Sequence, residues 1–153
     1  MLNDAIDSLA ERIIGCAIEV HRTMGPGLLE SLYRECLLIE LAGAGMDVEC
    51  ERLIAVDYKG RPLRTRLRID MLVEAAVLIE LKAVEGLRPV HSAQVMTYLR
   101  LTGHPAALLI NFNEVTLRAG LKRLDHPQRY ALTKQRTEDK GERKQEMRRG
   151  NRR

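Results

Sequence analysis

Two short apolar stretches, at 68–74 and 77–82, constrain the fold of this chain more than any other part of the sequence. Both are rich in aliphatic and β-branched residues, and a short link joins them, which predicts two buried strands paired as a hairpin. Charge interrupts each stretch where a buried strand should be apolar. Asp70 lies in the first stretch, and Glu80 and Lys82 lie in the second.

The spacing of these charges places them near one another. Side chains alternate across a strand, so Glu80 and Lys82 share one face while Leu81 points away. An antiparallel partner strand can bring Asp70 beside Glu80. Burying charge costs several kcal/mol unless the charges are paired or bind a metal. Two acids and one base leave a negative site that suits a hard divalent cation, although a salt-bridged strand pair without chemistry also explains them.

Size and composition are those of an ordinary globular domain. A length of 153 residues allows one domain with a substantial core, and 45% hydrophobic with 30% charged residues is a usual balance. Aromatic residues make up only 3%, which argues against a long groove that binds single strands by base stacking. No apolar run approaches the length of a membrane span, so we expect no membrane partner.

Positive charge is concentrated at the C-terminal end. Residues 134–153 hold 9 Lys/Arg and 4 Asp/Glu, while residues 1–133 hold 16 and 17. We therefore expect a folded domain at 1–130 and a basic, disordered tail at 131–153. Three cysteines without C-x-x-C spacing disfavour a disulfide framework and a zinc or iron–sulfur site, and they indicate a reduced, cytoplasmic protein.

Hydrophobic periodicity predicts the order α-α-β-β-β-α-β. We expect helices at 4–23, 28–43 and 90–103, strands at 47–58, 63–73, 76–84 and 106–112, and a short edge strand at 115–117. This order predicts an α/β domain in which helices flank a mixed sheet of four to five strands.

These elements and their residues resemble a known nuclease fold. The spacing Asp-x(9)-Glu-x-Lys at 70–82 is the core motif of the PD-(D/E)XK nuclease superfamily. Residues 27–33, Gly-Leu-Leu-Glu-Ser-Leu-Tyr, match G-x-x-E-x-x-Y, so the chain is similar to the small GxxExxY family. The segments 19–21, 25–27 and 110–112 also resemble that family. The resemblance covers about residues 5–125 and implies a restriction-endonuclease-like core.

The resemblance carries functional positions onto this chain. An acid on the first core helix matches Glu30, although the helix macrodipole alone also explains an acid at a helix N-terminus. The strand acids match Asp70 and Glu80, and the strand lysine matches Lys82. Ile69 stands where the motif's name has proline, and the four cysteines of the iron–sulfur members are lacking.

The chemistry that the resemblance implies is metal-dependent hydrolysis of nucleic-acid phosphodiesters. Asp70 and Glu80 would hold Mg²⁺ or Mn²⁺, with the Leu81 carbonyl and waters as further ligands. Glu30 would complete this site or hold a second ion. Lys82 would orient the attacking water or stabilise the developing negative charge.

A Gln-x-x-x-Tyr pattern on the following helix matches Gln94 and Tyr98. Gln94 would hold an acidic ligand or a phosphate by hydrogen bonding, and Tyr98 would contact the nucleic-acid backbone. Their structural alternatives are a solvated glutamine and a half-buried packing tyrosine.

The expected partner is nucleic acid, with DNA favoured over RNA, and a homo-oligomer is compatible with the sequence. The alternative function is a nucleic-acid-binding or partner-binding module that keeps the fold and cleaves nothing. The near-neutral charge of residues 1–133 weakens the case for strong DNA binding, because phosphate contacts supply most of the affinity.

Overall fold

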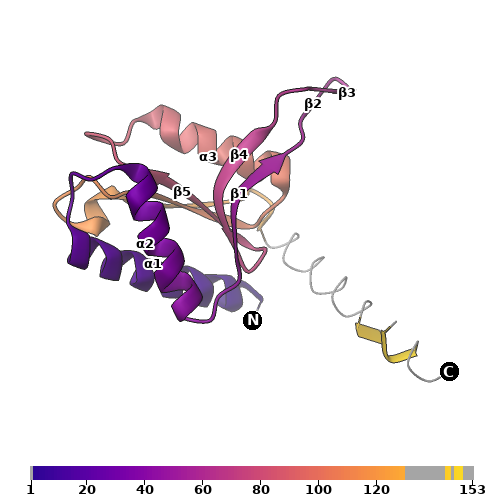
Figure 1. The fold of residues 1–153 in the computed structure, drawn as a ribbon. Coiled ribbons are helices and arrows are strands. Elements are labelled where there is room, and N and C mark those ends of the chain that lie inside the picture. The colour runs from indigo at the N-terminus through magenta and orange to yellow at the C-terminus, as the bar shows by residue number, and fades with distance from the viewer. Residues whose placement is uncertain (1, 130–143, 146, 150–153) are drawn as a thin grey trace.

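The computed structural model describes residues 2–129, 144–145 and 147–149 (Figure 1). Its elements follow the order α1 (Leu2–Met24), α2 (Glu30–Gly43), β1 (Val48–Ile54), β2 (Asp57–Tyr58), β3 (Arg61–Pro62), β4 (Leu67–Val73), β5 (Val77–Lys82), α3 (Pro89–Thr102), β6 (Ala106–Asn111), η1 (Leu117–Gly120) and β7 (Leu121–Asp125).

The main sheet has five strands in the order β1-β4-β5-β6-β7. β5 and β6 run parallel and the other neighbours run antiparallel. The parallel pair needs a crossover connection, which α3 supplies. Helices α1 and α2 cover one face and α3 covers the other (Figure 1). The predicted fold class, a mixed sheet flanked by helices, is confirmed.

The central strands are apolar on both faces, as strands between two helical layers must be. On one face Ile79 and Leu81 pack with α1 and α2 in the larger core cluster. On the other face Leu78 packs with Val95 and Leu99 of α3. All five side chains are fully buried, and each contributes about 1.5–3 kcal/mol of burial free energy. The charges of β5 therefore lie at the end of a well-packed strand.

The G-x-x-E-x-x-Y segment fixes the start of α2. Tyr33 is fully buried and its ring stacks on Phe112, with centroids 4.6 Å apart and planes inclined by 8°. Its hydroxyl donates to the Gly25 carbonyl at 2.6 Å and accepts from the Leu28 amide at 3.2 Å. Gly27 has a φ of +91°, which favours glycine. The tyrosine is thus structural, and it sets Glu30 as the first residue of α2.

The strands predicted at 47–58 and 63–73 differ from those observed. β1 ends at Ile54 and β4 begins at Leu67, and the residues between them form a separate two-stranded hairpin, β2–β3. This hairpin leaves the main sheet and extends beyond the body of the domain (Figure 1). Local alternation does not show where a hairpin loses its packing partners, which is why these strand boundaries were wrong.

The edge strand predicted at 115–117 is wrong. Val115 is 88% exposed, and the edge strand is β7, which follows the short helix η1. The chain passes very close to the end of β6 first, since a Cβ added at Gly120 would clash with the Asn111 carbonyl. The next strand, β7, therefore begins only after this close approach. The hydrophobic periodicity of residues 115–117 does not indicate it.

The tail predicted at 131–153 lies largely outside the described residues, so the domain boundary stays a prediction. No helix in the described part of the chain is long and apolar enough to cross a membrane. The three cysteines, all in that part, are free thiols. The cytoplasmic location also stays a prediction.

Candidate active site

Asp70 and Glu80 meet where β4 and β5 separate. The antiparallel pairs of these strands end at Met71–Ile79, and the next residue along each strand is one of the two acids. Asp70 Oδ2 accepts the backbone N–H of Leu81 at 2.8 Å, so a side chain replaces the strand ladder there. Asp70 is 6% exposed and Glu80 is 7% exposed. Two buried carboxylates therefore share the open end of this strand pair.

The backbone of Leu81 also faces this gap. In a strand, the N–H and C=O of one residue point toward the same neighbouring strand. Because the Leu81 N–H reaches Asp70, its carbonyl oxygen points to the same side. The adjacent Lys82 carbonyl points the other way and accepts from Phe112 at 3.0 Å. The predicted ligand oxygen of Leu81 thus lies on the side of the acids.

Arg34 of α2 is the principal counter-charge, and it is not among the residues predicted for the site. Its guanidinium lies 3.1 Å from Asp70 Oδ1, 3.3 Å from Glu30 Oε1 and 3.6 Å from Glu51 Oε1. The only sequence signal for it is its position four residues after Glu30, on the same helix face. Glu30 therefore reaches Asp70 through a cation and does not meet the strand acids directly.

Glu80 is the least compensated charge of the group. Its Oε1 lies 3.7 Å from Lys82 Nζ, and its buried Oε2 has no hydrogen-bond partner among the described residues. Burial, together with the negative charges of Asp70 and Glu30, raises the pKa of Glu80 to about 8 against the opposing charge of Lys82. At neutral pH, without a bound cation, Glu80 is therefore mostly protonated.

The two predicted residues of α3 contact each other. Gln94 Nε2 donates to the Tyr98 hydroxyl at 2.9 Å. Burial raises the pKa of Tyr98, and the negative charge of Glu80 raises it further. Tyr98 thus lies within electrostatic range of Glu80. Gln94 forms its hydrogen bond with Tyr98.

The donor set fits a hard divalent cation in part. Asp70 and Glu80 supply carboxylate oxygens, and a cation beside the unpartnered Glu80 Oε2 would keep that group ionised. Glu30 instead pairs with Arg34, the same guanidinium that pairs with Asp70. Within residues 2–129 and the short described segments beyond, no three His, Cys, Asp or Glu side chains form a ready ligand group. The site therefore fits a cation held by two carboxylates.

Comparison with known proteins gives one family match. A sequence model of the PD-(D/E)XK nuclease superfamily matches residues 7–124. A solved structure titled "Crystal structure of SSO0001" is similar with 20% identity and a TM-score of 0.47, over 71% of this chain and 55% of that chain. This chain thus spans about half the length of that protein. No curated protein matches the chain.

Proposed function

The chain belongs to the PD-(D/E)XK nuclease superfamily, and from this premise we propose that it is a nuclease that hydrolyses phosphodiester bonds with Mg²⁺ or Mn²⁺. The G-x-x-E-x-x-Y match at 27–33 supports placement in the GxxExxY family. The proposal takes nucleic acid as the substrate, with DNA favoured over RNA.

One observation carries the proposal: a buried carboxylate pair at a strand end, with Glu80 Oε2 unpartnered among the described residues. A fold gains no stability from such an arrangement, since an unpaired buried carboxylate costs several kcal/mol or takes up a proton. Strongly shifted pKa values of this kind cluster at functional sites. Binding of a cation by Glu80 explains why this buried position has a glutamate, when a glutamine would fill the same space without a charge.

The side chains divide the work by their positions. A divalent cation, when bound, supplies Lewis-acid polarisation of the scissile phosphate and a more acidic water. Asp70 and Glu80 would hold this cation, with the Leu81 carbonyl on the same side. Lys82, which lies 3.7 Å from Glu80, orients the attacking water or stabilises the developing charge. Arg34 fixes the orientation of Asp70 through its ion pair at 3.1 Å.

The test is a cleavage assay on linear and circular DNA and on RNA, single- and double-stranded, with Mg²⁺, with Mn²⁺ and with chelator. We expect metal-dependent cleavage that Lys82→Ala removes. Lys122→Ala is the matched control, because Lys122 is exposed on β7, two strands away from β5. Substrate binding without cleavage under every metal condition would favour the non-cleaving module instead.

A further inference from the structure

We propose that residues 57–66, which we term the arm, bind the phosphate backbone of the nucleic-acid substrate beside the active site. This inference rests on the proposed nuclease function and extends it to substrate capture. The arm contains β2, β3, the turn between them and the four residues 63–66 that precede β4. Figure 1 shows the β2–β3 hairpin projecting beyond the sheet and helices.

The arm has a defined backbone. Asp57 pairs with Pro62 and Tyr58 pairs with Arg61. The two central turn residues have positive φ values, 49° at Lys59 and 77° at Gly60, which is the hairpin turn whose twist matches that of its strands. At its base, the Leu63 amide donates to the Val56 carbonyl at 2.9 Å. The arm therefore has an ordered backbone from which its side chains extend.

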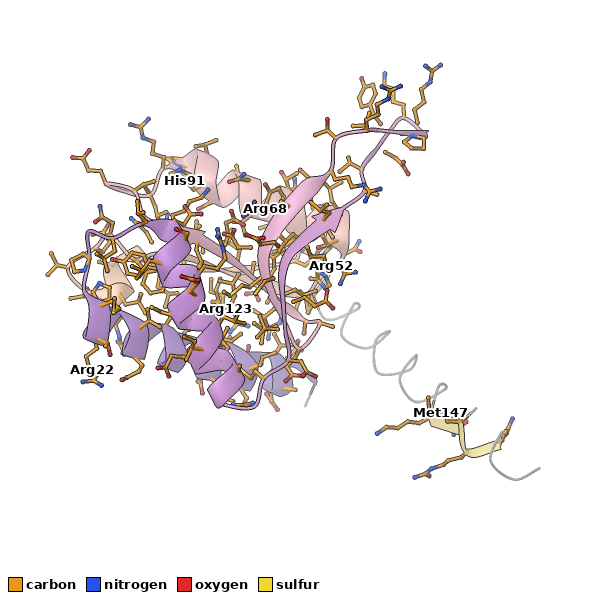
Figure 2. The ribbon with its side chains drawn as sticks, viewed as in Figure 1. Arg22, Arg52, Arg68, His91, Arg123 and Met147 are labelled. Carbon is orange, nitrogen blue, oxygen red and sulfur yellow. The ribbon has the colours of Figure 1, made fainter. Side chains whose placement is uncertain are left out.

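Four cations of the arm are free to bind a ligand. Lys59, Arg61, Arg64 and Arg66 are all exposed, and none has an ion-pair partner in the described part of the chain. Figure 2 shows side chains with nitrogen tips extending outward at the end of the hairpin.

The arginines at the base of the arm behave differently. Arg52 lies 3.0 Å from Glu49 and Arg68 lies 2.7 Å from Glu51, and both arginines are labelled near the sheet in Figure 2. The arginines of β1 and β4 thus pair with acids, whereas the cations of the arm do not.

The charge of the arm opposes that of the domain around it. The arm holds four Lys/Arg and one acid, Asp57, whereas the other residues of 1–133 hold 12 Lys/Arg and 16 Asp/Glu. Protection of a sheet edge or solubility alone is served by charges of mixed sign. A cluster of one sign on a negatively charged domain is suited to a polyanion, which the rest of the domain would repel.

The position of the arm links it to the site. It joins β4 at Leu67, three residues before Asp70, a separation of about 10 Å along a strand. Tyr58 is 61% exposed, with Lys59 Nζ 5.5 Å from its ring centroid. Exposed aromatic and basic groups together bind the bases and phosphates of nucleic acids. A backbone held by the arm would thus approach the acids at the end of the same strand.

Binding of a fluorescent 20-base-pair DNA duplex, titrated in chelator over a series of salt concentrations, tests the arm without cleavage. The arm variant is Arg61→Gln with Arg64→Gln. The matched control is Arg100→Gln with Lys122→Gln, two exposed cations outside the arm that lose the same charge. Each phosphate contact contributes about 0.9 to the log–log salt slope. We therefore expect the slope to fall by about 1.8 in the arm variant and to stay unchanged in the control.

A second substrate separates the arm from the active site. Thymidine 5′-p-nitrophenyl phosphate with Mn²⁺ is too small to reach both regions, so the arm variant should hydrolyse it at the wild-type rate. If the wild type cleaves duplex and the small ester while the arm variant keeps the control's slope, the arm inference alone is wrong. If the wild type neither binds duplex nor cleaves either substrate, the proposed function fails and the arm inference fails with it.

Discussion

The active site and the arm carry charges of the same kinds within a few residues of each other, yet they hold them in opposite ways. Asp70 and Glu80 are buried; Arg34 pairs with Asp70, and burial raises the pKa of Glu80. The cations of the arm are exposed, and water and counterions compensate them. A buried charge must therefore be neutralised by groups of the protein, whereas an exposed charge is solvated and remains available to bind a ligand.

This difference predicts different consequences of mutation. Changes in the site should alter chemistry, folding stability and pH dependence together, because its charges are coupled in a low-dielectric region. Changes in the arm should alter only affinity and its dependence on salt, since isolated surface charges contribute little to stability.

The largest expected effect is on turnover. Lys82→Ala should lower kcat by about 10²–10³-fold, the usual loss when one transition-state stabilising group is removed. Arg64→Ala should leave kcat unchanged and raise KM. Steady-state kinetics on a DNA substrate separates the two, and an equal loss of kcat in both variants would remove the distinction between site and arm.

The next effect is on folding. Arg34→Met removes a cation that contacts three acids, among them the buried Asp70, and should lower the free energy of unfolding in chelator by about 3 kcal/mol. Arg64→Met, on the arm, should change it by less than about 0.5 kcal/mol. Urea unfolding measures both values. If Arg34→Met is as stable as the wild type, the acids are balanced by something other than this guanidinium.

A smaller effect depends on pH. Burial and the charges of Asp70 and Glu30 raise the pKa of Glu80 from 4.5 to about 8, so the folded state binds the proton more tightly than the unfolded state. This contribution is complete below about pH 4.5 and is lost as the pH rises toward 8. In chelator at pH 8.5, Glu80→Gln should therefore unfold with a free energy about 2 kcal/mol above that of the wild type.

The matched control for this change is Glu35→Gln, at an exposed position of α2. It should keep the wild-type dependence of stability on pH. Thermal unfolding between pH 5 and 9 compares the three proteins. A Glu80→Gln protein that is less stable at every pH would identify Glu80 as a structural partner of Lys82.

The smallest effect compares one tyrosine from each region. Tyr98→Phe removes the hydroxyl that accepts from Gln94 at 2.9 Å and should destabilise the protein by about 1 kcal/mol. Tyr58→Phe, at an exposed position of the arm, should have no measurable effect on urea unfolding. Equal destabilisation by the two changes would contradict the difference in burial.

The strand acids were predictable because the relevant information is local. Charge at alternating positions of an apolar stretch, with a short link, was enough to place Asp70 beside Glu80. Arg34 was not predictable in its role. Its contact with Asp70 joins residues 36 positions apart, and only the packing of α2 on the sheet brings them together. The same packing makes Glu30 a partner of Arg34, where the sequence predicted it as a direct metal ligand.

The arm shows a different limit of sequence reasoning. Its turn is encoded locally by the backbone preferences of Gly60 and Pro62. The separation of the arm from the main sheet was not predictable, because Leu63 and Val56 continue the apolar pattern of the strands on either side. Whether a strand is buried depends on the strands and helices that pack against it, and the sequence of the segment alone does not specify them.

Calorimetric titration of Mn²⁺ into the wild type, Glu80→Gln and Glu35→Gln tests the central claim most directly. The claim is that the buried acids at the end of β4 and β5 form a cation site. We expect binding by the wild type and by Glu35→Gln, with loss of binding in Glu80→Gln. Equal Mn²⁺ affinity in all three proteins, or none in the wild type, would contradict it.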